Sequence, residues 1–138
     1  MRRVVFTAPH FSCMWKGMPR EDMRCEPETK KAIEAAQEVV RRCGLATKAV
    51  YGDVFRELVD LNRPEGRGTE FRDKVERELT WDTLVLDMHT SPPSAFDDGT
   101  DIMVLVSGRG RNRALAEDLA ERLRAEGLNI ELKPASRV

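Results

Sequence analysis

Hydrophobic residues along this chain fall into short, nearly unbroken runs, which are typical of strands buried within a sheet. Such runs predict strands at residues 3–8, 47–50, 83–89, 102–106 and 129–132. A further short strand is predicted through Leu58, Val59 and Leu61. Glycine, proline and charged residues interrupt the runs, so the strands are expected to be short and joined by turns.

Between these runs, hydrophobic residues recur every three or four positions, which is the spacing of a helix. The first helical stripe begins after Pro27 and ends at Gly44, two residues that often mark helix boundaries. Two further stripes cover residues 71–79 and 115–123, and Gly127 ends the last one. Because strands alternate with helices, the pattern predicts an α/β layer fold around a mixed, largely parallel central sheet.

Length and charge restrict the class of protein. A chain of 138 residues is predicted to form a single domain over residues 1–138. Charged residues make up 34% of the chain, and because their signs alternate we interpret them as solvated helix faces. With a net charge of −1, the chain is not expected to bind nucleic acid or an anionic membrane.

The sequence carries no pattern typical of a targeting or membrane segment. The apolar run after Arg3 is shorter than the ~7–15 residues of a signal-peptide core. No apolar stretch approaches the ~20 residues that a membrane span needs. We therefore expect a cytoplasmic protein, and the sequence leaves its oligomeric state open.

The chain has three cysteines, and their odd number without a signal peptide argues against a disulfide framework. Cys43 falls at an apolar helix position. Cys13 and Cys25 flank residues 11–25, which lack any hydrophobic period and are predicted to be an inserted loop or lid. Whether these two cysteines pair, bind metal with His10 or simply pack is left open by the sequence.

Both histidines of the chain lie at the ends of predicted strands. His10 follows the first strand, and His89 ends the strand at residues 83–89. In open α/β sheets, ligands gather at the carboxyl ends of strands. Asp87 and His89 are two positions apart on one strand and so lie on the same face. We therefore predict that the two histidines share a site. Asp87 either orients one of them by a hydrogen bond or simply meets water at the edge of the sheet.

A carboxylate would complete a zinc site, because two imidazoles and one carboxylate are the usual ligands of a catalytic zinc. The candidate is Glu26, which directly precedes Pro27. A carboxylate at this position can instead cap the following helix. Glu21, Asp22 and Glu28 compete with it as ligands.

Two arginine-containing segments are weaker candidates for ligand binding. Arg63 suits a carboxylate because of its forked guanidinium, although a surface position is the simpler interpretation. The segment "SGRGRNR" at residues 107–113 follows a strand and opens a helix, where a phosphate can bind. It lacks the further glycine and the lysine of nucleotide-binding loops, so we interpret it as an ordinary turn in which Arg109 or Arg111 faces an anionic substrate.

Three short motifs, in their order along the chain, resemble the N-formylglutamate amidohydrolase family. "APH" at residues 8–10, "VDLNRP" at 59–64 and "LDMHTS" at 86–91 are similar to that family's PHSG, DLNR and D-x-H-S motifs. "CEPETKKAIEAA" at residues 25–36 resembles a related branch, the phage poly-γ-glutamate hydrolases. Both branches are similar to zinc carboxypeptidases, so the resemblance implies a compact three-layer α/β/α sandwich.

The resemblance also implies roles for individual residues. It implies that Zn²⁺ is held by three residues, namely His10, Glu26 and His89. Asn62 and Arg63 match the pair that holds a substrate carboxylate in the carboxypeptidase-like enzymes. Glu131, in "NIELKP", matches the glutamate that acts as general base. The implied activity is hydrolysis of an amide or peptide bond next to a carboxylate, as in an N-acyl-glutamate or glutamyl substrate.

The chain departs from the family pattern between its first two expected ligands. Residues 11–13 are Phe-Ser-Cys where the family has small glycines, and 16 positions separate His10 from Glu26. Two alternative functions therefore stay open. One is a non-catalytic, carboxylate-binding domain of the same fold, and the other is a small phosphate- or nucleotide-binding protein that uses residues 107–113.

Overall fold

The structure is a computed structural model, which describes residues 2–15, 18–19, 25–53, 60–90, 99–106 and 111–134. The described residues form a mixed α/β fold with helices and small, mainly parallel sheets, which confirms the predicted fold class at this level. The chain divides into two compact units, Met1–Thr90 and Ser91–Val138, and each is described by itself. The expectation of a single domain stays a prediction.

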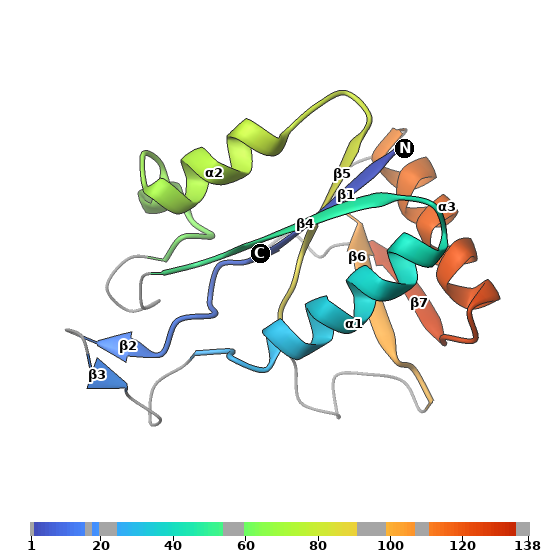
Figure 1. The fold of residues 1–138 in the computed structure, drawn as a ribbon, viewed down its shortest axis with the longest axis horizontal. Coiled ribbons are helices and arrows are strands. Elements are labelled where there is room, and N and C mark those ends of the chain that lie inside the picture. Colours follow the sequence, from blue (N-terminus) through green and yellow to red (C-terminus); the bar gives the residue numbers. More distant parts are fainter. Residues whose placement is uncertain are drawn as a thin grey trace. The chain divides into compact units, whose positions relative to one another are not determined.

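The first unit is built on a three-stranded parallel sheet (Figure 1). Its strands β1 (Arg3–Ala8), β4 (Ala46–Tyr51) and β5 (Thr83–Asp87) are arranged in the order β4-β1-β5. Val4 and Val5 of the central strand β1 are completely buried. Because all three strands run in the same direction, the residues that follow them emerge at the same edge of the sheet.

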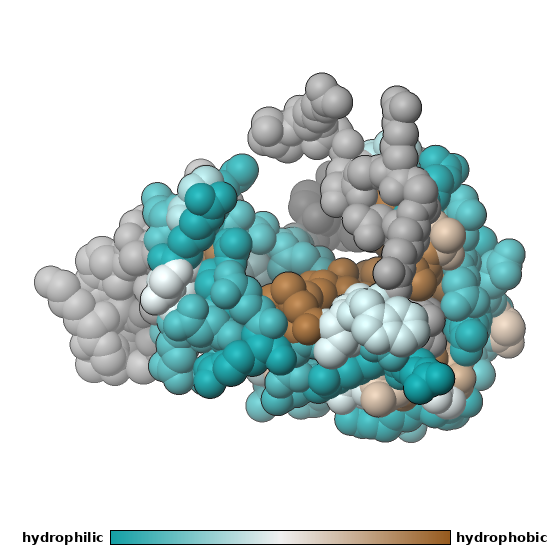
Figure 2. All heavy atoms as spheres, turned by 90° about the horizontal axis from the view of Figure 1, so that it is seen from above, coloured by the Kyte–Doolittle hydropathy of each residue, from teal (hydrophilic) through white to brown (hydrophobic). Residues whose placement is uncertain are grey.

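Helix α2 (Glu70–Glu78) covers one face of this sheet. Its Phe71 packs in a core cluster with buried valines of β1 and β4. The Thr69 hydroxyl accepts a hydrogen bond from the Arg72 N–H at 3.4 Å and so caps the start of the helix. Figure 2 shows hydrophilic residues (teal) over α2, in keeping with its charged outer face.

Helix α1 (Thr29–Arg42) contacts β1 and β4 from the opposite face of the sheet (Figure 1). Val4 and Phe6 alternate with the residues that face α2, so they point toward α1, and both are buried. Ile33 and Val40 of the helix are buried as well. The predicted helical stripe after Pro27 is thus confirmed, and it faces the sheet.

The segment predicted as an inserted loop contains two short strands. β2 (Met14–Trp15) and β3 (Met18–Pro19) pair in antiparallel register. Strands of only two residues leave no repeating hydrophobic pattern, so this small antiparallel pairing could not be predicted from the sequence of residues 11–25.

The second unit contains a two-stranded parallel sheet and a helix. β6 (Ile102–Val106) pairs with β7 (Ile130–Pro134), and α3 (Arg111–Ala125) contacts both strands. Leu119 and Ala120 of α3 are buried. These elements lie where the hydrophobic pattern predicts two strands and a helix.

The strand predicted through Leu58, Val59 and Leu61 is wrong at Leu61. This residue lies in a turn that leads into a 3₁₀ helix, Pro64–Gly66, and residues 54–59 lie outside the described part of the chain. Leu61 is nevertheless completely buried and packs with Phe71. Leu61 is hydrophobic because it packs into the core from a turn. In a hydrophobic pattern, such a residue cannot be distinguished from one in a buried strand.

A single central sheet is not found among the described strands. β4-β1-β5, β2-β3 and β6-β7 are separate sheets there. The expected three-layer sandwich around one central sheet therefore stays a prediction. No helix within the described residues combines the length and the hydrophobicity that crossing a membrane requires.

Candidate metal centre

The three residues predicted to bind metal lie together at the carboxyl ends of strands in the first unit. His10 follows β1, His89 follows β5, and Glu26 precedes α1. One potential ligand atom from each lies within 4.8 Å of the other two. Glu26 Oε2 is 3.0 Å from His10 Nδ1 and 3.3 Å from His89 Nδ1. The structure thus brings the three side chains to one place, and metal binding by them stays a prediction.

The backbone before His10 is fixed by a close approach of β4. The Gly52 N–H, just after β4, donates a hydrogen bond to the Ala8 carbonyl at 2.8 Å. A Cβ atom at Gly52 would lie only 2.3 Å from the Pro9 carbonyl oxygen, so a residue without a side chain is required there. His10 itself is 6% exposed, which leaves its ring little freedom to move.

Asp60 contacts the side of the His10 ring that faces away from Glu26. The distance from His10 Nε2 to Asp60 Oδ1 is 2.9 Å, and the Asn62 N–H donates to the same oxygen at 3.0 Å. A carboxylate in this position commonly fixes the orientation of a metal-binding histidine. Asp60 was not predicted as a site residue from the sequence. It is the aspartate of "VDLNRP", a motif in which only Asn62 and Arg63 were considered, as carboxylate-binding residues.

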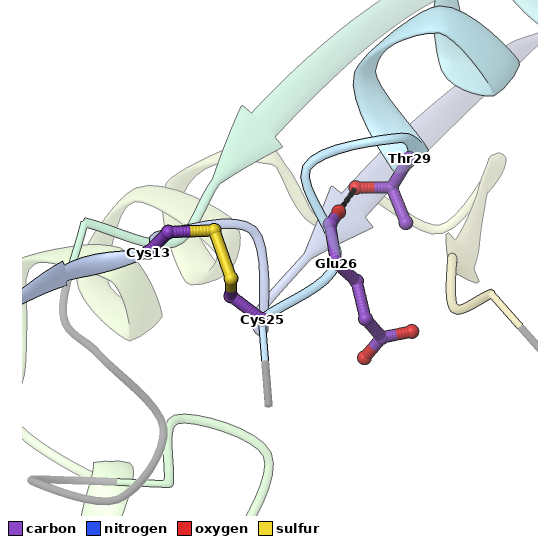
Figure 3. Close-up of a disulfide and its surroundings, with 4 residues drawn as sticks. All are labelled: Cys13, Cys25, Glu26 and Thr29. Atoms are coloured by element: carbon purple, nitrogen blue, oxygen red, sulfur yellow. Dashed lines mark hydrogen bonds between the residues drawn. A yellow bond between two sulfur atoms is a disulfide. The ribbon is translucent and has the colours of Figure 1, made fainter. Parts of the chain in front are cut away.

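The Glu26 carboxylate is held from both sides. Its Oε1 accepts a hydrogen bond from the Thr90 N–H at 2.5 Å, while Oε2 lies against the two histidines. Its main chain is anchored too, because the Glu26 N–H donates to the His10 carbonyl at 2.8 Å. The Thr29 hydroxyl donates to the Glu26 carbonyl at 2.6 Å (Figure 3). These contacts favour the ligand interpretation of Glu26 over a capping role for its carboxylate.

His89 contacts the carboxylate that the sequence placed beside it. His89 Nε2 lies 2.9 Å from Asp87 Oδ2, and the Thr7 hydroxyl donates to Asp87 Oδ1 at 2.7 Å. Thr7 pairs with Asp87 in the register of β1 and β5, so their side chains share one face of the sheet. Thr7 is 4% exposed. No sequence motif contained it, and only the strand register brings it to the site.

Both imidazoles therefore present the same nitrogen to the centre. When Nε2–H donates to a carboxylate, Nδ1 keeps its lone pair and is free to bind a metal. Asp60 imposes this arrangement on His10, and Asp87 imposes it on His89. Two imidazole nitrogens and one carboxylate oxygen form a donor set that fits zinc.

The charges of Glu26 and His89 stabilise one another in the metal-free protein. Burial raises the pKa of Glu26, but hydrogen bonds from His89 and Thr90 outweigh it and lower this pKa to about 2. The hydrogen bonds to Asp87 and then to Glu26 raise the pKa of His89 to about 9, against the opposing effect of burial. A metal ion at this centre must therefore replace the proton on His89 at neutral pH.

The predicted carboxylate-binding pair lies beside the centre. Arg63 Nε is 4.0 Å from Asp60 Oδ2, and Asp60 contacts His10. The Arg63 side chain is 59% exposed, and Asn62 is exposed as well. An exposed guanidinium near the centre is accessible to bind the carboxylate of a ligand from solution.

The structure does not describe several of the other candidates. Arg109, Glu21 and Asp22 fall outside the described residues, as does most of the turn at 107–113. Glu28 is exposed in the turn before α1.

Glu131, the expected general base, lies on β7 of the second unit. Its Oε1 forms an ion pair with Lys133 Nζ at 2.9 Å. Its Oε2 is buried and has no hydrogen-bond partner among the described residues.

Cys13 and Cys25 form a disulfide, with their Cα atoms 5.2 Å apart (Figure 3). The sequence left open whether these two cysteines pair, and in the structure they do. Bonded sulfurs are not thiolate ligands, so the alternative zinc site of these cysteines with His10 is excluded while the disulfide is intact. Cys43 takes no part in a disulfide and is half-buried.

Comparisons with protein-family models, with curated proteins and with solved structures give no match to this chain.

Proposed function

We propose that this protein is a zinc-dependent amidohydrolase that cleaves an amide or peptide bond adjacent to a carboxylate. The observation that carries the proposal is the convergence of His10, Glu26 and His89 from three separate segments of the chain. The order of the four sequence motifs supports the same class of enzyme, with an N-acyl-glutamate or glutamyl compound as substrate. The finer fold belongs to this proposal too, namely a compact, carboxypeptidase-like three-layer sandwich.

Zinc fits these residues because each histidine is already oriented by a carboxylate and offers Nδ1 to the Glu26 side. His10 Nδ1, His89 Nδ1 and the Glu26 carboxylate would hold the ion. Zinc held by three such ligands would supply a bound water molecule that ionises near neutral pH. The ion itself would also polarise a carbonyl group.

The remaining roles fall to residues of the chain itself. Arg63, with Asn62 beside it, binds the substrate carboxylate and so orients the bond to be cleaved. Glu131 accepts a proton from the attacking water and passes it to the leaving nitrogen. The role of Glu131 is assigned from the resemblance of residues 129–134, not from its position. Asp60 and Asp87 keep the two histidine rings in place.

The proposal is tested by assaying zinc-loaded protein with N-acyl-glutamates and with poly-γ-glutamate. We expect release of a free amine from substrates that carry the adjacent carboxylate, and little or none from matched amides that lack it. His89→Ala, loaded under the same conditions, should abolish the activity. A zinc-loaded protein that releases no amine from any of these substrates would contradict the proposal.

One observation favours a second candidate, a non-catalytic domain that binds carboxylates. One oxygen of Glu131 is already paired with Lys133, which competes with a role in proton transfer. In this case the zinc-loaded protein would bind glutamate derivatives with an affinity that depends on Arg63, and would leave them intact. Calorimetric binding measured alongside the assay separates the two candidates.

A further inference from the structure

The disulfide joins the two segments that carry His10 and Glu26. His10 lies three residues before Cys13, and Glu26 directly follows Cys25. Along the chain these two ligands are 16 positions apart. Through the disulfide, the covalent path from His10 to Glu26 is much shorter, because it runs only over residues 10–13, the S–S bond and residues 25–26. The bond therefore joins the two ends of the segment predicted as an insertion, next to Glu26 (Figure 3).

Several contacts among the described residues hold Glu26 beside His10. The Glu26 N–H donates to the His10 carbonyl at 2.8 Å, and Glu26 Oε2 lies 3.0 Å from His10 Nδ1. His10 is fixed from its N-terminal side by β1, and Glu26 is fixed from its C-terminal side by Thr29 and through its carboxylate by Thr90. The disulfide adds a covalent link to these contacts, and without it the two ends are brought together at a greater cost in chain entropy.

The disulfide lies outside the hydrophobic core of the unit. Cys13 and Cys25 are only half-buried, and neither belongs to the core cluster around Phe71. Neither cysteine is among the buried residues of the core. Loss of the bond is therefore expected to disturb the position of Glu26 more than the fold.

We propose that the Cys13–Cys25 disulfide is a positioning element of the metal centre, which holds Glu26 in place and makes metal affinity depend on the redox state of this pair. This inference rests on the proposed metal site. The chemistry is a two-electron exchange with a dithiol. The dithiol is oxidised to its cyclic disulfide, the S–S bond breaks, and Cys13 and Cys25 each take up a proton to become thiols.

The test is a zinc titration against a chromophoric chelator. Four samples are compared: oxidised wild type, wild type reduced with a dithiol and then desalted without oxygen, Cys13→Ser/Cys25→Ser, and Cys43→Ser. We expect zinc affinity to fall at least about tenfold in the double serine variant, which has no thiols to replace Glu26 as ligands. Cys43→Ser should match the oxidised wild type, and reoxidation of the reduced wild type should restore its affinity.

A second comparison distinguishes positioning from general destabilisation. If the disulfide acts through Glu26, then Cys13→Ser/Cys25→Ser should weaken zinc binding little or not at all when Glu26→Ala is already present. The Co²⁺-loaded double serine variant should also show a changed absorption spectrum, since its coordination changes.

Three outcomes would overturn the inference. Equal zinc affinity of oxidised wild type and the double serine variant would do so, and so would full additivity with Glu26→Ala; both leave the proposed zinc site standing. Failure of the oxidised wild type to bind zinc at all would overturn the proposed function and this inference together.

Discussion

At the scale of single residues, the proposed metal centre contains two histidines that are each held between two partners. His10 lies between Glu26 and Asp60, and His89 lies between Glu26 and Asp87. The shared glutamate places both Nδ1 atoms on one side, and the outer aspartates fix the rings. Such outer partners commonly change metal affinity about 10- to 100-fold when they are removed.

Thr7 is expected to act on the centre through Asp87. Thr7→Val keeps the shape of the side chain but removes the hydroxyl that donates to Asp87 at 2.7 Å. Zinc affinity should fall by up to about tenfold, the lower end of the effect of such outer partners, and Thr7→Ser should restore it. The measurement is the same chelator competition.

Thr47→Val provides the matched control for this substitution. Thr47 lies on the neighbouring strand β4, and its hydroxyl is buried with no hydrogen-bond partner among the described residues. Zinc affinity should therefore be unchanged in Thr47→Val. Equal affinities of Thr7→Val and wild type would show that the Thr7 hydroxyl does not orient the centre.

The stability of the metal-free protein should depend on pH through Glu26 and His89. The pKa of His89 is raised from 6.5 to about 9, so its charge stabilises the fold fully below pH 6.5, and this contribution is lost as the pH rises to 9. The pKa of Glu26 is lowered from 4.5 to about 2, so its contribution is present above pH 4.5 and is lost toward pH 2. The contact between Glu26 and His89 contributes to both shifts, although the Asp87 hydrogen bond is the larger cause for His89.

Urea unfolding of metal-free wild type and His89→Gln, followed from about pH 3 to about pH 10, checks this dependence. The stability difference between the two proteins should be largest between pH 4.5 and 6.5 and should shrink toward pH 9. A difference that does not vary with pH would contradict the assigned contacts of His89.

At the scale of secondary-structure elements, the hydrophobic pattern was sufficient for the strands and helices that have a clear period. The predicted strands at residues 3–8 and 102–106 have the bounds of β1 and β6. The pattern failed at Leu61, because a buried residue in a turn looks like part of a strand. It also contained no information on the pairing of Thr7 with Asp87, since register depends on partners far apart in sequence.

The candidate site was predictable where residue chemistry and strand ends coincide. His10 and His89 are the only histidines and both follow strands, so their proximity follows from the fold class. Glu26 was one of several acids near a helix start, and only its resemblance to a known motif singled it out. Asp60 and the disulfide depend on how the chain returns to the site, which composition and spacing do not encode.

The junction between β4 and the turn at His10 should tolerate no side chain. In Gly52→Ala, the added methyl would meet the Pro9 carbonyl oxygen at 2.3 Å, and that backbone precedes a metal ligand directly. We expect a loss of about 1–3 kcal/mol in unfolding free energy, together with weaker zinc binding. Thermal unfolding and zinc titration measure the two effects.

Asp53→Ala is a suitable control, because Asp53 is the next residue and is exposed. It should leave both stability and zinc affinity close to those of the wild type. If Gly52→Ala behaved in the same way, the close approach of β4 to the Pro9–His10 turn would not be important for the centre.

At the scale of the whole molecule, the proposed activity draws on both compact units. The metal ligands and Arg63 belong to Met1–Thr90, whereas Glu131 belongs to Ser91–Val138. The proposal therefore divides the two functions: metal binding is a property of the first unit, and proton transfer requires the second.

Glu131→Gln tests this division. The substitution should lower kcat by about 10²- to 10⁴-fold while zinc affinity stays at the wild-type value, because it removes the proton acceptor and no ligand. Glu121→Gln, an exposed position on α3, serves as the control and should retain full activity. An equal loss of zinc affinity in Glu131→Gln would instead indicate that Glu131 affects the metal centre itself.

The most direct test of the central claim is a crystal structure of the zinc-loaded protein. The proposal predicts one zinc ion about 2.0–2.1 Å from both His10 Nδ1 and His89 Nδ1, and about 2.0–2.2 Å from a carboxylate oxygen of Glu26. Asp60 and Asp87 should remain hydrogen-bonded to the Nε2 atoms of the two rings. A zinc ion bound by other side chains, or no zinc between His10 and His89, would contradict the claim.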